Sequence, residues 1–125
     1  MGKDPAIRVV LLPKDTNSHG TIFGGIILSY IDLAGAVEAG KVTNQFYVTK
    51  AMKEVAFKEP VRVGEVVSFY TSTTRVGNTS ISVHVDVEVL RGEKEIHVTE
   101  ADLTYVCIDE HCRPTPVIRR ERAPI

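Results

Sequence analysis

The chain has 125 residues, with 15 lysines and arginines against 16 aspartates and glutamates, and a formal charge of −1. This length fits a single domain with one hydrophobic core, and the 43% of apolar and 25% of charged residues exclude fibrous and disordered chains. The balanced charge argues against a nucleic-acid binder, and two cysteines are too few for a disulfide scaffold.

The apolar pattern predicts a strand, a helix and four further strands, in that order along the chain. The first strand covers residues 7–12, and the polar residues 14–20 that follow are typical of a loop. Gly24 and Gly25 open a helix that ends near Gly40. From there the hydrophobic period is two, which is typical of strands, and the predicted strands cover 45–57, 64–74, 81–89 and 96–108.

The connections between the last four strands are short, so these strands are predicted to be antiparallel neighbours. Tight turns are expected at Gly77-Asn78 and Arg91-Gly92. The predicted class is α+β, with one long helix against a sheet of about five to six antiparallel strands. A single domain spans residues 1–125, with its core at about 7–116 and a basic, proline-containing, mostly irregular tail over 114–125.

Apolar residues occupy nearly every face of the predicted helix. A helix that is apolar all round is expected to be buried all round. Either the sheet wraps around it or a second copy of the chain covers its remaining side. Asp32 and Ser29 interrupt this apolar segment, so it is a poor membrane span. No apolar stretch of signal-peptide length follows Met1, and the expected location is the cytoplasm with reduced thiols.

Asp32 lies about two turns into this helix, where an unpaired buried carboxylate costs several kcal/mol. Its helical neighbours Ser29, Gly35 and Ala36 are small and predict open space over the carboxylate. Two interpretations remain open from the pattern. Asp32 is a structural residue that caps a loop or pairs with a basic residue, or it is a catalytic carboxylate in a dry cleft.

The segment before the helix contains a second set of candidate site residues. Gly24 and Gly25 offer free N–H groups at a helix start, where they can hold an oxyanion, or they serve only the geometry of a tight turn. His19 lies beside this turn and is a candidate to line the site. His84 and His97 lie on predicted strands and are expected to be structural or surface residues. The four histidines show no metal-ligand spacing, and no metal is predicted.

The segment Pro13-Lys14-Asp15-Thr16-Asn17-Ser18-His19-Gly20-Thr21-Ile22-Phe23-Gly24-Gly25, followed by Asp32, resembles the signature of hotdog-fold acyl-CoA thioesterases of the YciA and brain acyl-CoA hydrolase type. The resemblance continues through 57–65, 75–80 and 103–109, and covers the chain from about residue 7 to about residue 116. It implies the hotdog fold, in which an antiparallel sheet wraps one long helix.

The resemblance also implies a function: hydrolysis of an acyl-CoA thioester to a free acid and CoA, without metal or other cofactor. Asp32 matches the catalytic carboxylate, as general base or nucleophile, and Asn17 matches the second active-site residue. Gly24 and Gly25 are the candidates to stabilise the oxyanion. The two catalytic positions come from different subunits in such enzymes, which implies a homodimer with shared sites, commonly in a trimer of dimers.

The predicted substrate-binding residues are His19, Phe23, Lys58, Arg75, Val76, Gly77, Asn78, Thr79 and Ser80. Relatives often carry arginine where this chain has Asn78, so the phosphate contact falls to Arg75, Lys58 or the tail residues Arg119, Arg120 and Arg122. A solvated basic end is the simpler interpretation of that tail. No nucleic acid or membrane partner is expected. The alternative functions are a non-catalytic acyl-CoA binder and, less favoured, a hotdog dehydratase or hydratase.

Overall fold

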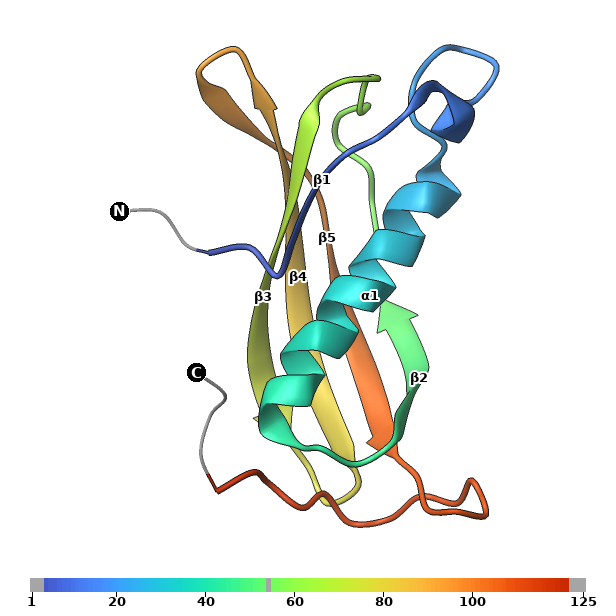
Figure 1. The fold of residues 1–125 in the computed structure, drawn as a ribbon, viewed down its shortest axis with the longest axis vertical. Coiled ribbons are helices and arrows are strands. Elements are labelled where there is room, and N and C mark those ends of the chain that lie inside the picture. Colours follow the sequence, from blue (N-terminus) through green and yellow to red (C-terminus); the bar gives the residue numbers. More distant parts are fainter. Residues whose placement is uncertain (1–3, 54, 122–125) are drawn as a thin grey trace.

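The computed structural model describes residues 4–53 and 55–121 (Figure 1). Its elements follow the predicted order of one strand, one helix and four strands. They are β1 (Ile7–Val10), a short 3-10 turn (Pro13–Asp15), α1 (Gly24–Val42), β2 (Tyr47–Lys53), β3 (Val66–Val76), β4 (Ser80–Arg91) and β5 (Lys94–Cys107). Arg122, one of the predicted tail cations, lies outside the described residues.

The five strands form one antiparallel sheet in the order β1-β3-β4-β5-β2. Both predicted tight turns occur, one between β3 and β4 and one between β4 and β5, where Gly92 has a positive φ of 66°. α1 crosses one face of the curled sheet (Figure 1). The prediction of an α+β hotdog architecture is therefore confirmed, with five strands.

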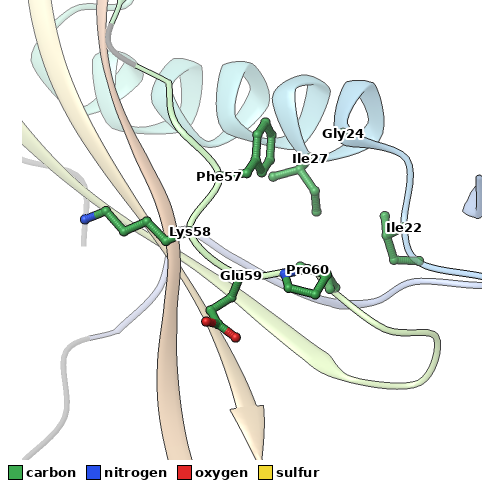
Figure 2. A pocket seen from close by; sticks show the side chains of 8 residues that line it. Ile22, Gly24, Ile27, Phe57, Lys58, Glu59 and Pro60 are labelled. Atoms are coloured by element: carbon green, nitrogen blue, oxygen red, sulfur yellow. The ribbon is translucent and has the colours of Figure 1, made fainter. Parts of the chain in front are cut away.

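The predicted strand over 45–57 is too long, because β2 covers Tyr47–Lys53 and residues 55–57 are not in a strand. The pairing of β2 with β5 ends at Lys53, opposite Asp102. Residues 55–58 form no regular strand, although Lys58 N–H still donates to Val98 O of β5 at 2.8 Å, and Phe57 lies beside Gly24 at the start of α1 (Figure 2). The β-rich residues of this segment therefore have two roles: those of β2 pair with β5, and Phe57 contacts the helix.

The core lies between α1 and the inner face of the sheet. The alternation predicted for 81–89 holds, since every second residue of this part of β4 is fully buried: Ile81, Val83, Val85, Val87 and Val89. Ile27, Ile31 and Ala34 face them from α1. Each large aliphatic side chain buried here contributes roughly 1.5–3 kcal/mol.

The sheet covers only one side of α1. Ile31 and Ala34 are fully buried, whereas Leu33 is 56% exposed and Val37 nearly half exposed. The expectation that the helix is buried on all faces is therefore not met within one chain. Leu33 and Val37 make the uncovered side partly apolar, and exposed apolar surface of this kind is typical of interaction sites.

The tail is irregular, as predicted, but it is held by hydrogen bonds across the lower end of the molecule in Figure 1. Val117 N–H donates to Asn78 O at 2.8 Å, and Arg120 N–H donates to Val42 O at 2.8 Å. The Arg120 Nε donates to Gly40 O at 2.8 Å, which satisfies a carbonyl at the C-terminal end of α1. No helix of the described residues has the length and hydropathy needed to cross a membrane.

Candidate active site

The Asp32 carboxylate lies in the middle of α1, between the face packed on the sheet and the exposed face. Its Oδ1 accepts a 2.6 Å hydrogen bond from Thr49 Oγ1 of β2 and a 3.2 Å bond from the Tyr105 hydroxyl of β5. Among the described residues, no donor bonds Oδ2 and no lysine or arginine pairs with Asp32. One carboxylate oxygen is thus fixed, and the other is left with its lone pairs available.

Tyr105 holds the helix backbone at the same position. Its hydroxyl donates to the Asp32 carbonyl oxygen at 2.7 Å and shares the proton with Oδ1. Burial and then the negative charge of Asp32 raise the pKa of Tyr105, so the hydroxyl stays protonated and keeps donating.

Gly35 makes this contact possible. A Cβ at residue 35 would overlap the Tyr105 hydroxyl and lie 3.1 Å from two of its ring carbons. The small residue three positions after Asp32 was expected to leave open space over the carboxylate. Instead, that space admits the hydroxyl of Tyr105, which anchors the helix turn that carries Asp32.

A second carboxylate on α1, Glu38, was not singled out from the sequence and has a different environment. Its two oxygens accept hydrogen bonds from Thr71 at 2.9 Å and Thr73 at 2.8 Å, and Lys41 lies 3.3 Å away. Burial alone would raise the pKa of Glu38, but these donors and the lysine hold it below its usual value. Because both oxygens are occupied, Glu38 fits a structural role.

The start of α1 offers unpaired backbone donors. The first-turn N–H groups of Gly24 and Gly25 have no carbonyl four residues back within the helix, and the preceding Phe23 supplies no capping side chain. The Phe23 side chain is more than half exposed and lies beside Gly25. This end of the helix is therefore suited to stabilising negative charge on an oxygen.

Asn17 organises the loop before the helix. Its Oδ1 accepts the N–H of His19 at 2.8 Å and of Thr21 at 3.2 Å, and its Nδ2 donates to Thr21 Oγ1 at 2.9 Å. His19 is exposed. The helix rise places Asp32 about 12 Å along the axis from Gly24, so one chain does not bring Asn17 or His19 to Asp32.

The predicted substrate-binding segment 75–80 lies at the opposite end of the molecule, in the turn between β3 and β4 (Figure 1). Gly77 N–H donates to Ser80 O at 2.8 Å and closes this turn. Thr79 contributes to a pocket of about 280 Å³, whose other lining residues are Val48, Lys50, Val106, Ile108, Cys112 and Pro114. Asn17 and the segment 75–80 therefore lie toward opposite ends of one chain, with Asp32 between them.

Another pocket, of about 270 Å³, lies between the start of α1 and the segment after β2 (Figure 2). Ile22, Ile27 and Phe57 give it an apolar lining. The Lys58 side chain points away from it, and its Nζ lies 3.5 Å from Glu100 Oε2. The structure thus places Lys58 against the outer face of the sheet and does not bring it to Asp32.

The sequence pattern did not predict that Thr49 and Tyr105 are the hydrogen-bond partners of Asp32. Tyr105 follows the apolar alternation of its strand and has the pattern of an ordinary core residue. Thr49 lies in a strand with no motif of its own. The only available signal was the carboxylate itself, because an acid in an apolar helix requires donors from elsewhere in the fold.

Comparison with known proteins shows the family of this chain. Residues 19–96 match the family model described as the thioesterase superfamily. The acyl-CoA thioester hydrolase YciA of Salmonella typhimurium is 35% identical over 116 residues, which cover 89% of this chain and 87% of YciA.

Two crystal structures show the same fold. One is Cj0915 of Campylobacter jejuni, described as a hexameric hotdog fold thioesterase. It has a TM-score of 0.86 and 43% identity, and the match covers 93% of this chain and 91% of Cj0915. The other is HI0827, described as a hexameric broad specificity acyl-coenzyme A thioesterase. It has a TM-score of 0.88 and 32% identity, covering 98% of this chain and 86% of HI0827.

Proposed function

Since this chain belongs to the thioesterase superfamily, we propose that it hydrolyses acyl-CoA thioesters to a free acid and CoA. The observation that carries this function is the Asp32 carboxylate, an acid in an apolar helix whose Oδ1 is held by Thr49 and Tyr105. Its free Oδ2 is the reactive atom. No histidine among the described residues bonds Asp32, which disfavours dehydratase chemistry, where a histidine works with the carboxylate.

The reaction needs one ionised carboxylate oxygen and donors for the developing oxyanion. As a general base, Asp32 removes a proton from water, and the hydroxide adds to the thioester carbonyl carbon. The C–S bond then breaks, and CoA leaves as a thiolate that takes up a proton. As a nucleophile, Asp32 instead attacks the same carbon and forms an anhydride, which water hydrolyses. Both routes use the same free Oδ2, and neither requires a metal ion or a further cofactor.

The proposed active site is shared between two copies of the chain. Asp32 comes from one copy, and Asn17 with the N–H groups of Gly24 and Gly25 comes from the other. The separation of about 12 Å between Asp32 and Gly24 along one helix supports this division. The segment 75–80 contacts the CoA part of the substrate, where Arg75 supplies positive charge.

Two apolar surfaces support the dimer. Leu33 and Val37 are exposed on α1, and Phe46 and Val48 are exposed at and before β2, with Phe46 84% exposed. β2 is also an edge strand of the sheet, and the backbone groups of such an edge can pair with another chain. Three dimers form the complete assembly, in line with the hexameric relatives. The protein acts in the cytoplasm, whose reducing conditions suit the free thiols of Cys107 and Cys112.

A thiol-release assay across acyl-CoA chain lengths tests the function. The purified protein is expected to release CoA thiol with multiple turnovers per chain. A non-catalytic binder would instead bind acyl-CoA in a calorimetric titration without releasing thiol. Stoichiometric binding with no release at any chain length would therefore overturn the hydrolase assignment.

A further inference from the structure

The outer face of the sheet, opposite α1, carries a cluster of ionisable side chains that the hydrolytic reaction does not use. The antiparallel register of β4 and β5 sets His84 opposite Asp102 and Asp86 opposite Glu100. We call these residues and their two neighbours the outer-face cluster: His84, Asp86, His97, Glu100, Asp102 and Lys58. These residues form no metal-ligand motif in the sequence, since they come together only through the register of the two strands.

Two imidazole nitrogens of this cluster converge on the same two carboxylates. The Nε2 of His84 lies 3.3 Å from Asp86 Oδ1 and 3.3 Å from Glu100 Oε1. The Nε2 of His97 lies 3.4 Å from the same Asp86 oxygen and 3.6 Å from Glu100 Oε2. His84, Asp86 and Glu100 offer three ligand atoms that all lie within 4.8 Å of one another.

The orientation of His84 calls for a positive charge between these groups. Its Nδ1 donates to Asp102 Oδ1 at 2.8 Å, since an ionised carboxylate can only accept. Nε2 therefore faces two further acceptors, and its lone pair would be repelled unless a proton or a metal ion lies between them. Burial alone would lower the pKa of His84, but Asp102 and Asp86 raise it, so the proton is the competitor of a metal here.

The geometry and the charge both suit a metal ion. Tetrahedral zinc, with bonds of about 2.0–2.1 Å, sets its ligand atoms about 3.3 Å apart, which matches the spacing around His84 Nε2. A carboxylate on the far ring nitrogen, as Asp102 provides, is the usual support for a metal-binding histidine. With neutral imidazoles the outer-face cluster carries two net negative charges, which one divalent cation balances, and Glu88 opposite His97 adds further negative charge.

We propose that His84, Asp86 and Glu100 bind one divalent transition-metal ion of the Zn²⁺ class on the outer face of the sheet. Imidazole and carboxylate ligands together favour zinc or cobalt over magnesium and calcium, which prefer oxygen alone. The site is independent of the hydrolytic reaction, because the sheet separates it from Asp32.

The test uses the tag-free full chain, stripped with a chelator and titrated with Zn²⁺ by calorimetry and with Co²⁺ by visible absorption. At about pH 7.5 we expect one ion per chain and a cobalt spectrum of tetrahedral type, with weaker binding at about pH 5.5 because protons compete. Zn²⁺ should raise the melting temperature, Mg²⁺ should not, and the chelator-treated protein should keep its acyl-CoA hydrolysis.

Variants assign the ligands. His84→Gln and Glu100→Gln should each weaken Zn²⁺ binding by at least about tenfold, whereas His111→Gln, which changes an exposed histidine outside the cluster, should not. If the His84 variant does not fold, the Zn²⁺ affinity of the Glu100 variant tests the proposed ligands. The proposal is overturned if the wild-type chain binds no stoichiometric Zn²⁺, or if both variants bind it as the wild type does.

Discussion

Replacing Asp32 with asparagine is expected to lower kcat/KM for acyl-CoA hydrolysis by at least about a hundredfold, the range for losing a general base. The asparagine oxygen can still accept the Thr49 hydroxyl, which lies 2.6 Å from Oδ1 in the native chain, so the helix and its surroundings are retained. The amide, however, can neither take a proton from water nor attack the thioester carbon. The thiol-release assay measures the loss, and thermal melting verifies that the variant is folded.

Glu38→Gln is the matched control, because it removes the other carboxylate of the same helix. Glu38 is bound by Thr71 and Thr73 on the side facing the sheet, so its replacement should leave the hydrolysis rate near the wild-type value. An Asp32→Asn protein that hydrolyses acyl-CoA as fast as the wild type would remove Asp32 from the mechanism. So would an equal loss of rate in both folded variants.

Gly35→Ala is expected to lower the free energy of unfolding by about 1–3 kcal/mol, the usual cost of overpacking a core. In an ordinary helix the same change would stabilise the fold, since alanine is the better helix former by about 1 kcal/mol. Here the added methyl overlaps the Tyr105 hydroxyl and displaces it from its 2.7 Å bond to the Asp32 carbonyl. The turn that carries Asp32 loses its anchor, so kcat should also fall. Denaturant unfolding at fixed protein concentration and the thiol-release assay measure the two effects.

Two further variants isolate the contact. Gly40→Ala changes a glycine near the end of the same helix, where the new methyl would lie 3.1 Å from the Tyr47 hydroxyl instead of overlapping it, and should destabilise the fold less than Gly35→Ala. Tyr105→Phe removes the hydroxyl that the Gly35 methyl would meet. The double variant Gly35→Ala/Tyr105→Phe should therefore be more stable than the sum of the two single effects. Strict additivity would show that the helix and Tyr105 do not meet as described.

The parts of this fold that follow a hydrophobic period could be predicted from the sequence. The alternation over 81–89 identified both faces of β4, and the apolar helix was identified because its composition differs from that of every other segment. The end of β2 was not predicted, because the β-rich residues continue to Phe57, whereas the regular pairing with β5 ends at Lys53 and Phe57 contacts the start of α1. Composition does not distinguish these two environments.

The partners of the functional groups depend on register, which the sequence does not reveal. Asp32 was recognisable because a carboxylate is unusual in an apolar helix, whereas Thr49 and Tyr105 lie 17 and 73 residues away and have ordinary strand patterns. The same holds for the outer face. His84 could be placed on a polar face, but not opposite Asp102, because a shift of two residues in the pairing would preserve the pattern and change every neighbour.

The division of the active site between two copies is tested most directly by mixing two inactive variants. Asp32→Asn and Asn17→Ala are purified separately, shown to be folded and poorly active, and then mixed until mass spectrometry shows exchanged subunits. Each mixed dimer contains one site with both changes and one intact site, so the mixture should recover about a quarter of wild-type activity. No recovery despite proven exchange, or an Asn17→Ala protein with wild-type activity on its own, would contradict a site built from Asp32 of one copy and Asn17 of the other.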